Sequence, residues 1–126
     1  GSRKNLILFY VSMSALLQYK EKMIEKIVEV MEVASERSGE VAFIWKEDSM
    51  IGLNEKALGK TLYRKYQKLR EEAMAGHTMI YAENMRDETL VAICDGYYGM
   101  PSELGNKFQV LHKPVMIVMI PYGDVS

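Results

Sequence analysis

The sequence predicts an α/β domain, a doubly wound and twisted parallel sheet of five strands with helices on both faces. Short, continuous apolar runs recur along the chain, and such runs are typical of strands that are buried on both sides of a sheet. Amphipathic stretches with helical spacing separate the runs. Because this alternation forces parallel pairing with right-handed crossovers, we expect the strand order 3-2-1-4-5.

The first half of the chain begins with the clearest strand and the clearest helix. Residues 5–11 read N-L-I-L-F-Y-V and predict a buried strand. Ser14 is a good N-cap for a helix that we expect to continue to about Arg37. Its apolar residues fall at helical spacing: Leu16, Met23, Ile27, Val30 and Ala34. Gly39 follows at a typical helix C-terminus, and residues 41–45 (V-A-F-I-W) predict the second strand.

The second half continues the alternation with weaker signals. Residues 50–59 are poorly patterned, residues 60–75 predict a helix, and residues 77–82 (H-T-M-I-Y-A) predict a third strand. A short helix over 88–92 is expected before a fourth strand near 91–95. The remaining expectations are a loop over 96–101, a helix over 102–112, and a fifth strand over 115–120 (V-M-I-V-M-I).

Composition limits the class of protein. A chain of 126 residues fits one domain, and a formal net charge of −1 without a basic stripe argues against nucleic-acid binding. One cysteine, Cys94, excludes an internal disulfide and favours a cytoplasmic protein. The longest apolar run, 115–120, is far shorter than the roughly 20 residues of a membrane span. We interpret residues 1–2 as a tag remnant and residues 3–126 as a single domain excised from a larger, two-domain protein.

A ligand site is expected where the strand order reverses. In open parallel sheets ligands bind outside the carboxyl ends of the strands at this point, which here lies between the first and fourth strands. Ser12 and Ser14 would line one wall, and Ser102 would begin the helix on the other, so that free helix amides face a phosphate. Gly99 would let the backbone approach such a group closely. Tyr97 and Tyr98 would stack on a base or a sugar.

The other candidate catalytic, metal-binding and cofactor-binding residues give weaker signals. No G-x-G-x-x-G follows the first strand and no P-loop lysine motif occurs, which disfavours classical dinucleotide and ATP sites. We expect no metal, because zinc-type spacings are absent, and no cofactor. His77 and His112 are interpreted as surface or capping residues, and Cys94 as a small core residue. Glu47 and Asp48 end the second strand on the ligand edge and are candidates for acid–base chemistry.

Four motifs occur in an order that resembles a known family: S-M-S-A-L-L-Q-Y-K-E-K-M (12–23), F-I-W-K-E-D-S-M (43–50), C-D-G-Y-Y-G-M-P-S-E-L (94–104) and H-K-P-V-M-I (112–117). Together they resemble the C-terminal half of CDP-glycerol glycerophosphotransferase-like proteins of bacterial cell-wall and capsule synthesis. The resemblance implies the second Rossmann-like domain of a GT-B architecture. It also implies that Asp95 and Ser102 hold the donor phosphate, and that Tyr97, Tyr98 and Gly99 match a Tyr-Tyr-Gly variant.

The chain departs from that family at two charged positions. Asp48 stands where the family has a histidine implicated in catalysis or phosphate contact, so it is the catalytic candidate that the resemblance implies. Glu103 replaces the second serine of a helix-capping pair. Each carboxylate would repel a diphosphate by on the order of 1 kcal/mol at an effective dielectric constant near 20.

Two functions therefore remain open, with a third less favoured. The first is the donor-binding domain of a glycosyl- or glycerophosphotransferase that makes a surface glycan or a teichoic-acid-like polymer. Its partners would be a CDP- or UDP-linked donor and a missing N-terminal domain. The protein would be cytoplasmic, and it would contact the inner face of the membrane only as the full-length protein. The second is a degenerate Rossmann-like binding or interaction module without catalytic activity. The third is a stand-alone flavodoxin-like domain, which is less favoured because this sequence has no suitable phosphate-binding loop.

Overall fold

The computed structural model describes residues 4–76 and 79–120 and contains one parallel sheet with the order β3-β2-β1-β4-β5. The predicted fold class and strand order are both confirmed. The strands are β1 (Asn5–Val11), β2 (Val41–Glu47), β3 (Ile80–Tyr81), β4 (Gly96–Gly99) and β5 (Val115–Ile117). The helices are α1 (Met13–Tyr19), α2 (Glu21–Glu36), α3 (Met50–Leu53), α4 (Glu55–Leu58), α5 (Lys60–Ala75), α6 (Asp87–Ile93) and α7 (Glu103–Val110).

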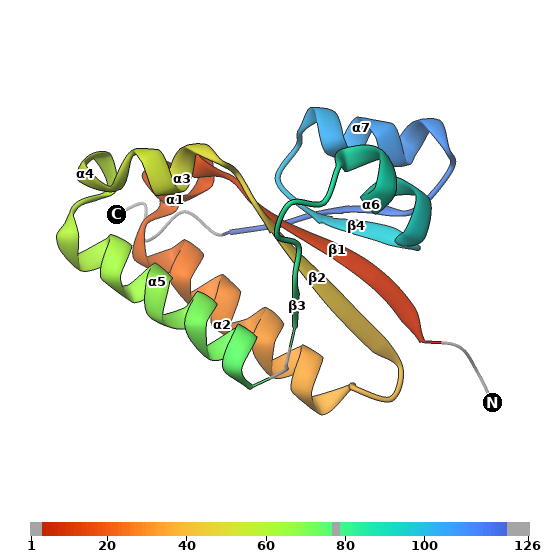
Figure 1. Ribbon diagram of the computed structural model, residues 1–126, viewed down its shortest axis with the longest axis horizontal. Coiled ribbons are helices and arrows are strands. Elements are labelled where there is room, and N and C mark those ends of the chain that lie inside the picture. Colours follow the sequence, from red (N-terminus) through yellow and green to blue (C-terminus); the bar gives the residue numbers. More distant parts are fainter. Residues whose placement is uncertain (1–3, 77–78, 121–126) are drawn as a thin grey trace.

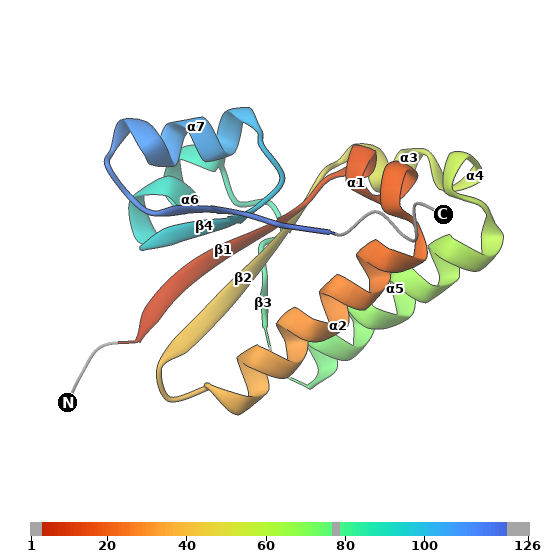
Figure 2. The same cartoon turned by 180° about the vertical axis from the view of Figure 1, so that it is seen from behind.

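The helices form a layer on each face of the sheet (Figures 1 and 2). The long helices α2 and α5 lie side by side on one face, and the shorter α6 and α7 lie on the other. Successive residues of a strand point to opposite faces, so β1 contributes to both layers. Phe9 and Val11 enter the core beneath α2 and α5, while Leu8 enters the core beneath α6 and α7.

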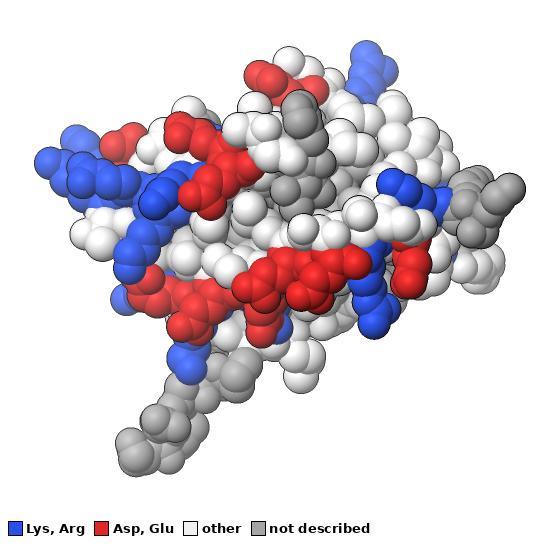
Figure 3. All heavy atoms as spheres, turned by 90° about the horizontal axis from the view of Figure 1, so that it is seen from below, with Lys and Arg blue, Asp and Glu red and all other residues white. Residues whose placement is uncertain are grey.

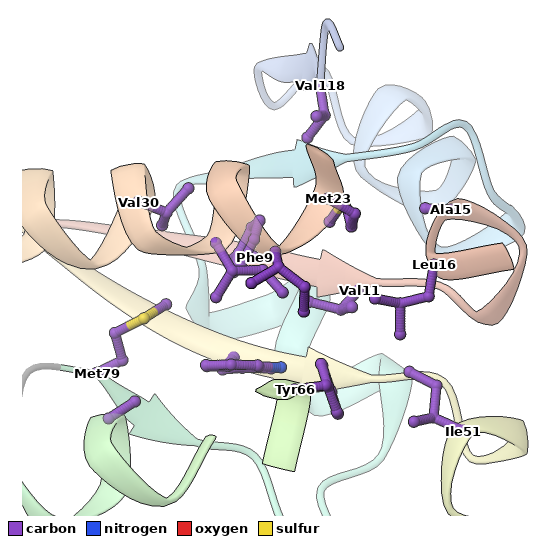
Figure 4. Packing of buried hydrophobic residues seen from close by; sticks show 14 of the residues in the cluster. Phe9, Val11, Ala15, Leu16, Met23, Val30, Ile51, Tyr66, Met79 and Val118 are labelled. Carbon is purple, nitrogen blue, oxygen red and sulfur yellow. The ribbon is translucent and has the colours of Figure 1, made fainter. Parts of the chain in front are cut away.

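The larger core lies between the sheet and the two long helices (Figure 4). Trp45 of β2 and Tyr66 of α5 are both buried, and their rings meet edge to face with centroids 5.8 Å apart. Phe9 of β1 packs in the same way on Trp45 at 6.1 Å. Aromatic pairs of this geometry are worth about 1 kcal/mol beyond the area they bury. This packing fixes the sheet against α5.

The predicted helix over residues 14–37 is divided in two. Lys20 adopts a positive φ of 48° and ends α1, and α2 then begins at Glu21. The Lys20 amide still donates to the Leu16 carbonyl, as in a helix C-cap. Apolar spacing alone does not reveal such a break, because the residues on both sides of Lys20 keep one side toward the same core.

The predicted position of the fourth strand was wrong. Residues 87–93 form α6, and β4 runs over 96–99, in the segment expected to be a loop. The two glycines of β4 explain the error. A Cβ at Gly99 would lie 2.9 Å from the Tyr10 carbonyl oxygen, and one at Gly96 would lie 3.2 Å from the Ile7 side chain. The glycines that look like loop residues are therefore needed for close strand packing.

The remaining strands are shorter than expected. Of the segment predicted as the third strand, residues 80–81 are paired, and residues 77–78 lie outside the described residues. The fifth strand ends at Ile117 rather than at residue 120. None of the helices within the described residues has the length and apolar character that crossing a membrane requires.

Candidate functional site

A hollow of about 390 Å³ opens at the carboxyl edge of the sheet, where the strand order reverses. Tyr10 at the end of β1 forms its floor. Residues 46–49, which follow β2, form one wall. Asp87 at the start of α6 and residues 102–104 at the start of α7 form the other. We call this feature the carboxyl-edge hollow. It lies where the topology predicts a ligand site.

The carboxyl-edge hollow is acidic. Four carboxylates line it, those of Glu47, Asp48, Asp87 and Glu103, against the single ammonium group of Lys46. Lys46 also donates to the Met85 carbonyl at 3.3 Å. Such a lining attracts cationic or hydroxyl-bearing groups and repels a diphosphate.

Asp48, the candidate catalytic residue, has both carboxylate oxygens engaged by backbone amides. Oδ2 accepts from the Met13 amide at 3.1 Å, and Oδ1 accepts from the Met50 amide at 3.0 Å. The Asp48 amide donates in turn to the Val11 carbonyl at 2.9 Å. The side chain thereby joins the start of α1 to the start of α3. It also takes up an amide that a phosphate at this helix would otherwise use.

Ser12 and Ser14 lie close to Asp48 but do not line the carboxyl-edge hollow. Ser12 is buried and caps α1, because its Oγ accepts from the Ala15 amide at 3.1 Å. The exposed Ser14 has its Oγ 3.3 Å from that of Ser12. Their positions are those of a capped helix start rather than of an open phosphate wall.

Ser102 does line the hollow, within a small hydrogen-bond network. Its Oγ accepts from the Gly105 amide at 3.0 Å and so caps α7. The same Oγ lies 2.8 Å from the Tyr97 hydroxyl, which donates to the Met100 carbonyl at 2.5 Å. Because the Tyr97 proton is used on Met100, the Ser102 hydroxyl donates to Tyr97. The network holds the β4–α7 turn in place.

The two consecutive tyrosines lie on opposite faces of the sheet. Tyr97 is fully buried among residues of α6 and α7. Tyr98 points to the other face and stacks on Phe9, with centroids 5.9 Å apart. Neither lines the carboxyl-edge hollow, and neither does Gly99, which closes against Tyr10. They became strand residues because β4 begins later than predicted, and strand residues alternate between faces.

Asp95 lies at the other edge of the sheet, at the amino end of β4. Its Oδ2 accepts from the Leu6 amide at 2.7 Å, and its amide donates to the Leu6 carbonyl at 2.7 Å. The structure therefore does not bring Asp95 together with Ser102. The later start of β4 again explains the difference, since Asp95 precedes the strand instead of ending it.

Several residues of the hollow, Tyr10 and Asp87 among them, were not among the predicted site residues. Burial, followed by the charges of Asp48, Tyr97 and Asp87, raises the pKa of Tyr10 to about 12. Alternation along β1 could have found Tyr10, since it follows Leu6 and Leu8 on the same face. Asp87 carries no comparable signal, because only the tertiary structure brings the start of α6 beside β1.

Glu47 is held by three side chains. Tyr66 donates to its Oε2 at 2.5 Å, Arg70 approaches both oxygens at 2.9 and 3.2 Å, and Tyr81 donates to Oε1. The Arg70 guanidinium also lies 5.9 Å from the centroid of the Tyr81 ring. Burial and the adjacent Glu47 carboxylate raise the pKa values of both tyrosines, that of Tyr81 to about 12. This cluster fastens α5 to β2 and β3, so Glu47 is not free for acid–base chemistry.

The remaining candidates do not form a metal site or a nucleophile. Within residues 4–76 and 79–120, no three histidine, cysteine, aspartate or glutamate side chains are placed so that they could hold one metal ion. Cys94 is buried, and burial raises its pKa to about 11, which disfavours the thiolate. His112 is an exposed residue with φ of 58° at the end of α7, and His77 lies outside the described residues.

Comparisons of the chain with protein-family models, with curated proteins and with solved structures found no match. The carboxyl-edge hollow offers one cation, the hydroxyls of Ser49 and Ser102, and the half-buried Tyr10 among four carboxylates.

Proposed function

We propose that this domain is a Rossmann-like binding or interaction module without catalytic activity of its own. The observation that carries the proposal is the position of Asp48. Its carboxylate accepts the Met13 amide at the start of α1, next to the point where an open sheet of this order would receive a phosphate. The protein thus supplies its own anion at that position.

The two acid–base candidates at the end of β2, Glu47 and Asp48, support the same proposal because hydrogen bonds engage both carboxylates and an ion pair also engages Glu47. General acid–base catalysis needs a titratable group that can reach the substrate. Glu47 is held by Tyr66 and Arg70, and Asp48 is held by two amides. Asp87 lies 4.0 Å from the Lys107 ammonium group, and both side chains are partly exposed. Glu103 is an exposed residue in the first turn of α7.

A nucleotide titration tests the proposal. The domain is titrated with CDP, UDP and CDP-glycerol while its melting temperature and amide chemical shifts are followed. We expect no change in melting temperature and no saturable shifts at Tyr10, Lys46 or Ser102. Saturable binding of any of the three at the carboxyl-edge hollow would contradict the proposal.

The second candidate is the donor-binding domain of a glycosyl- or glycerophosphotransferase. It is favoured by the position of the hollow at the switch point, by Ser102 and Lys46 in its wall, and by the family resemblance of the motifs. In that case the domain would hold a CDP- or UDP-linked donor in the cytoplasm. An N-terminal domain would supply the acceptor for a surface polymer.

The titration separates the two candidates. For a transferase, a donor at 100 times its dissociation constant should stabilise the fold by roughly 2.7 kcal/mol. Ser102→Ala should weaken that binding. Ser35→Ala, at an exposed position of α2, is the matched control and should leave it unchanged.

A further inference from the structure

A second and larger opening, of about 650 Å³, lies on the α2 face of the sheet. Four strands contribute to its floor, with Ile7 from β1, Phe43 from β2, Tyr98 from β4 and Met116 from β5. Val33 of α2 forms part of its wall. We call this feature the α2 groove. It lies over the amino half of the sheet, whereas the carboxyl-edge hollow lies at the opposite edge.

The α2 groove is open because the helices of this face do not extend over β5. The described helices that pack on β4 and β5 belong to the other face (Figures 1 and 2). After β5 the chain crosses the carboxyl half of the α2 face, where Val118 is 3% exposed and Ile120 packs against the core. None of the described elements covers the amino half, where Met116 is 46% and Val33 is 39% exposed. Parallel sheets normally have both faces covered.

Acidic side chains border the α2 groove. Four glutamates lie along it, namely Glu29, Glu32, Glu36 and Glu40. Figure 3, which shows the underside of the molecule, displays a row of acidic side chains across this face. Glu29, Glu32 and Glu36 are spaced to lie on one side of α2.

Two cations accompany these glutamates but do not balance them. Lys26 pairs with Glu29 at 2.7 Å, and Arg37 approaches Glu40 at 3.9 Å. In the part of the chain that the structure describes, no ion pair involves Glu32 or Glu36. The border of the groove is therefore negative.

We infer that the α2 groove binds an amphipathic helix of a partner protein, with its apolar side on the sheet and basic residues facing α2. An apolar floor bordered by carboxylates complements a helix with these two sides. A helix lying beside α2 over β4 and β5 would complete the layer that this face lacks. The inference rests on the proposed function, because it supplies the surface that an interaction module needs.

A second copy of this chain fits the groove less well. In a twofold dimer the same patch meets itself. Glu32 and Glu36 of one copy would then approach the same glutamates of the other, and like charges across an interface are unfavourable. Charge thus selects a basic partner over self-association.

The test uses the 126-residue chain and two synthetic helical peptides of about 18 residues, long enough to span the sheet. Both peptides have a leucine stripe, flanked by lysine in one and by glutamate in the other. Amide shifts are followed during titration. We expect the lysine peptide to bind, with shifts centred on Ile7, Val33, Tyr98 and Met116, and the glutamate peptide not to bind.

Variants distinguish binding in the α2 groove from non-specific electrostatic binding elsewhere on the surface. Met116→Glu places a charge on the floor and should weaken binding at least about tenfold, while Met119→Glu, at a 77% exposed position outside the groove, should not. The double variant Glu32→Lys/Glu36→Lys should also weaken it about tenfold. The matched variant Glu71→Lys/Glu72→Lys, on the exposed side of α5, should leave the affinity unchanged.

Several results would overturn the inference: no binding, equal binding of both peptides, shifts away from the groove, or no effect of Met116→Glu. A concentration-dependent dimer in sedimentation that Met116→Glu abolishes would also overturn it, because the occupant would then be a second copy. Nucleotide binding at Tyr10 and Ser102 would contradict the proposed function alone, since those residues lie at the other edge of the sheet. The two failures are therefore distinguishable.

Discussion

The carboxylate of Asp48 accepts a hydrogen bond from the amide of Met13 at 3.1 Å. This contact links the end of β2 to the start of α1, two segments that the sequence separates by a long helix. The same carboxylate also receives the Met50 amide. Asp48 therefore acts as a clamp between neighbouring loops at the carboxyl edge. This role explains why a carboxylate side chain stands at a helix start that would otherwise suit a bound phosphate.

Replacing Asp48 by alanine should destabilise the fold. Two amides would lose their partner, and loss of such a cap costs about 1–2 kcal/mol. Urea denaturation followed by circular dichroism measures the loss. Glu103→Gln is the control, because Glu103 is exposed, and it should change stability by less than about 0.5 kcal/mol. Equal effects of the two substitutions would show that Asp48 is not a clamp.

Breaking the pair between Glu47 and Arg70 should also be destabilising. Their side chains are only 17% and 21% exposed, so Glu47→Gln should lower the unfolding free energy by about 1–3 kcal/mol, between the values for surface and buried pairs. A double-mutant cycle with Arg70→Met measures the coupling between the two side chains. A coupling of zero would mean that the tyrosines alone hold Glu47.

Stability should fall at alkaline pH. The pKa values of Tyr10 and Tyr81 are raised to about 12 in the folded protein, from 10.0. A group with a raised folded pKa stabilises the protein fully below its unfolded pKa, and this stabilisation is lost as pH rises toward the folded value. Unfolding free energy should therefore decline between about pH 10 and 12. Tyr81→Phe should make the decline shallower. An unchanged slope would contradict the contribution of the raised Tyr81 pKa to this loss of stability.

Gly99→Ala should be strongly destabilising, although it adds only one methyl group. The added Cβ would lie 2.9 Å from the Tyr10 carbonyl oxygen and 3.0 Å from the Tyr97 hydroxyl. Relief requires β4 to move away from β1, which should cost about 1–3 kcal/mol. Gly52→Ala is the matched control, because a Cβ added at Gly52, in α3, would meet nothing within 4 Å. Thermal melts should show a fall in melting temperature for Gly99→Ala alone.

The sequence predicted the parts of the fold that depend on local pattern. Buried strands such as 5–11 read as continuous apolar runs, and the alternation with helices left one preferred topology. It also predicted a ligand site at the carboxyl edge between β1 and β4, and the carboxyl-edge hollow opens there. The fourth strand escaped prediction, because Gly96 and Gly99 serve close packing between strands, and no local pattern distinguishes that use of glycine from a turn.

The tertiary structure decided what lies at that edge and what faces away from it. Because β4 begins later in the sequence than predicted, Asp95 lies at the opposite edge, and Tyr97 and Tyr98 lie on different faces of the sheet. The pairing of Asp48 with Met13, and the open floor around Met116, arise where segments distant in sequence meet. The sequence by itself determined the layers and the strand order, because side-chain period fixes which face is buried. Register and contacts between distant loops determined the charge and shape of the two openings.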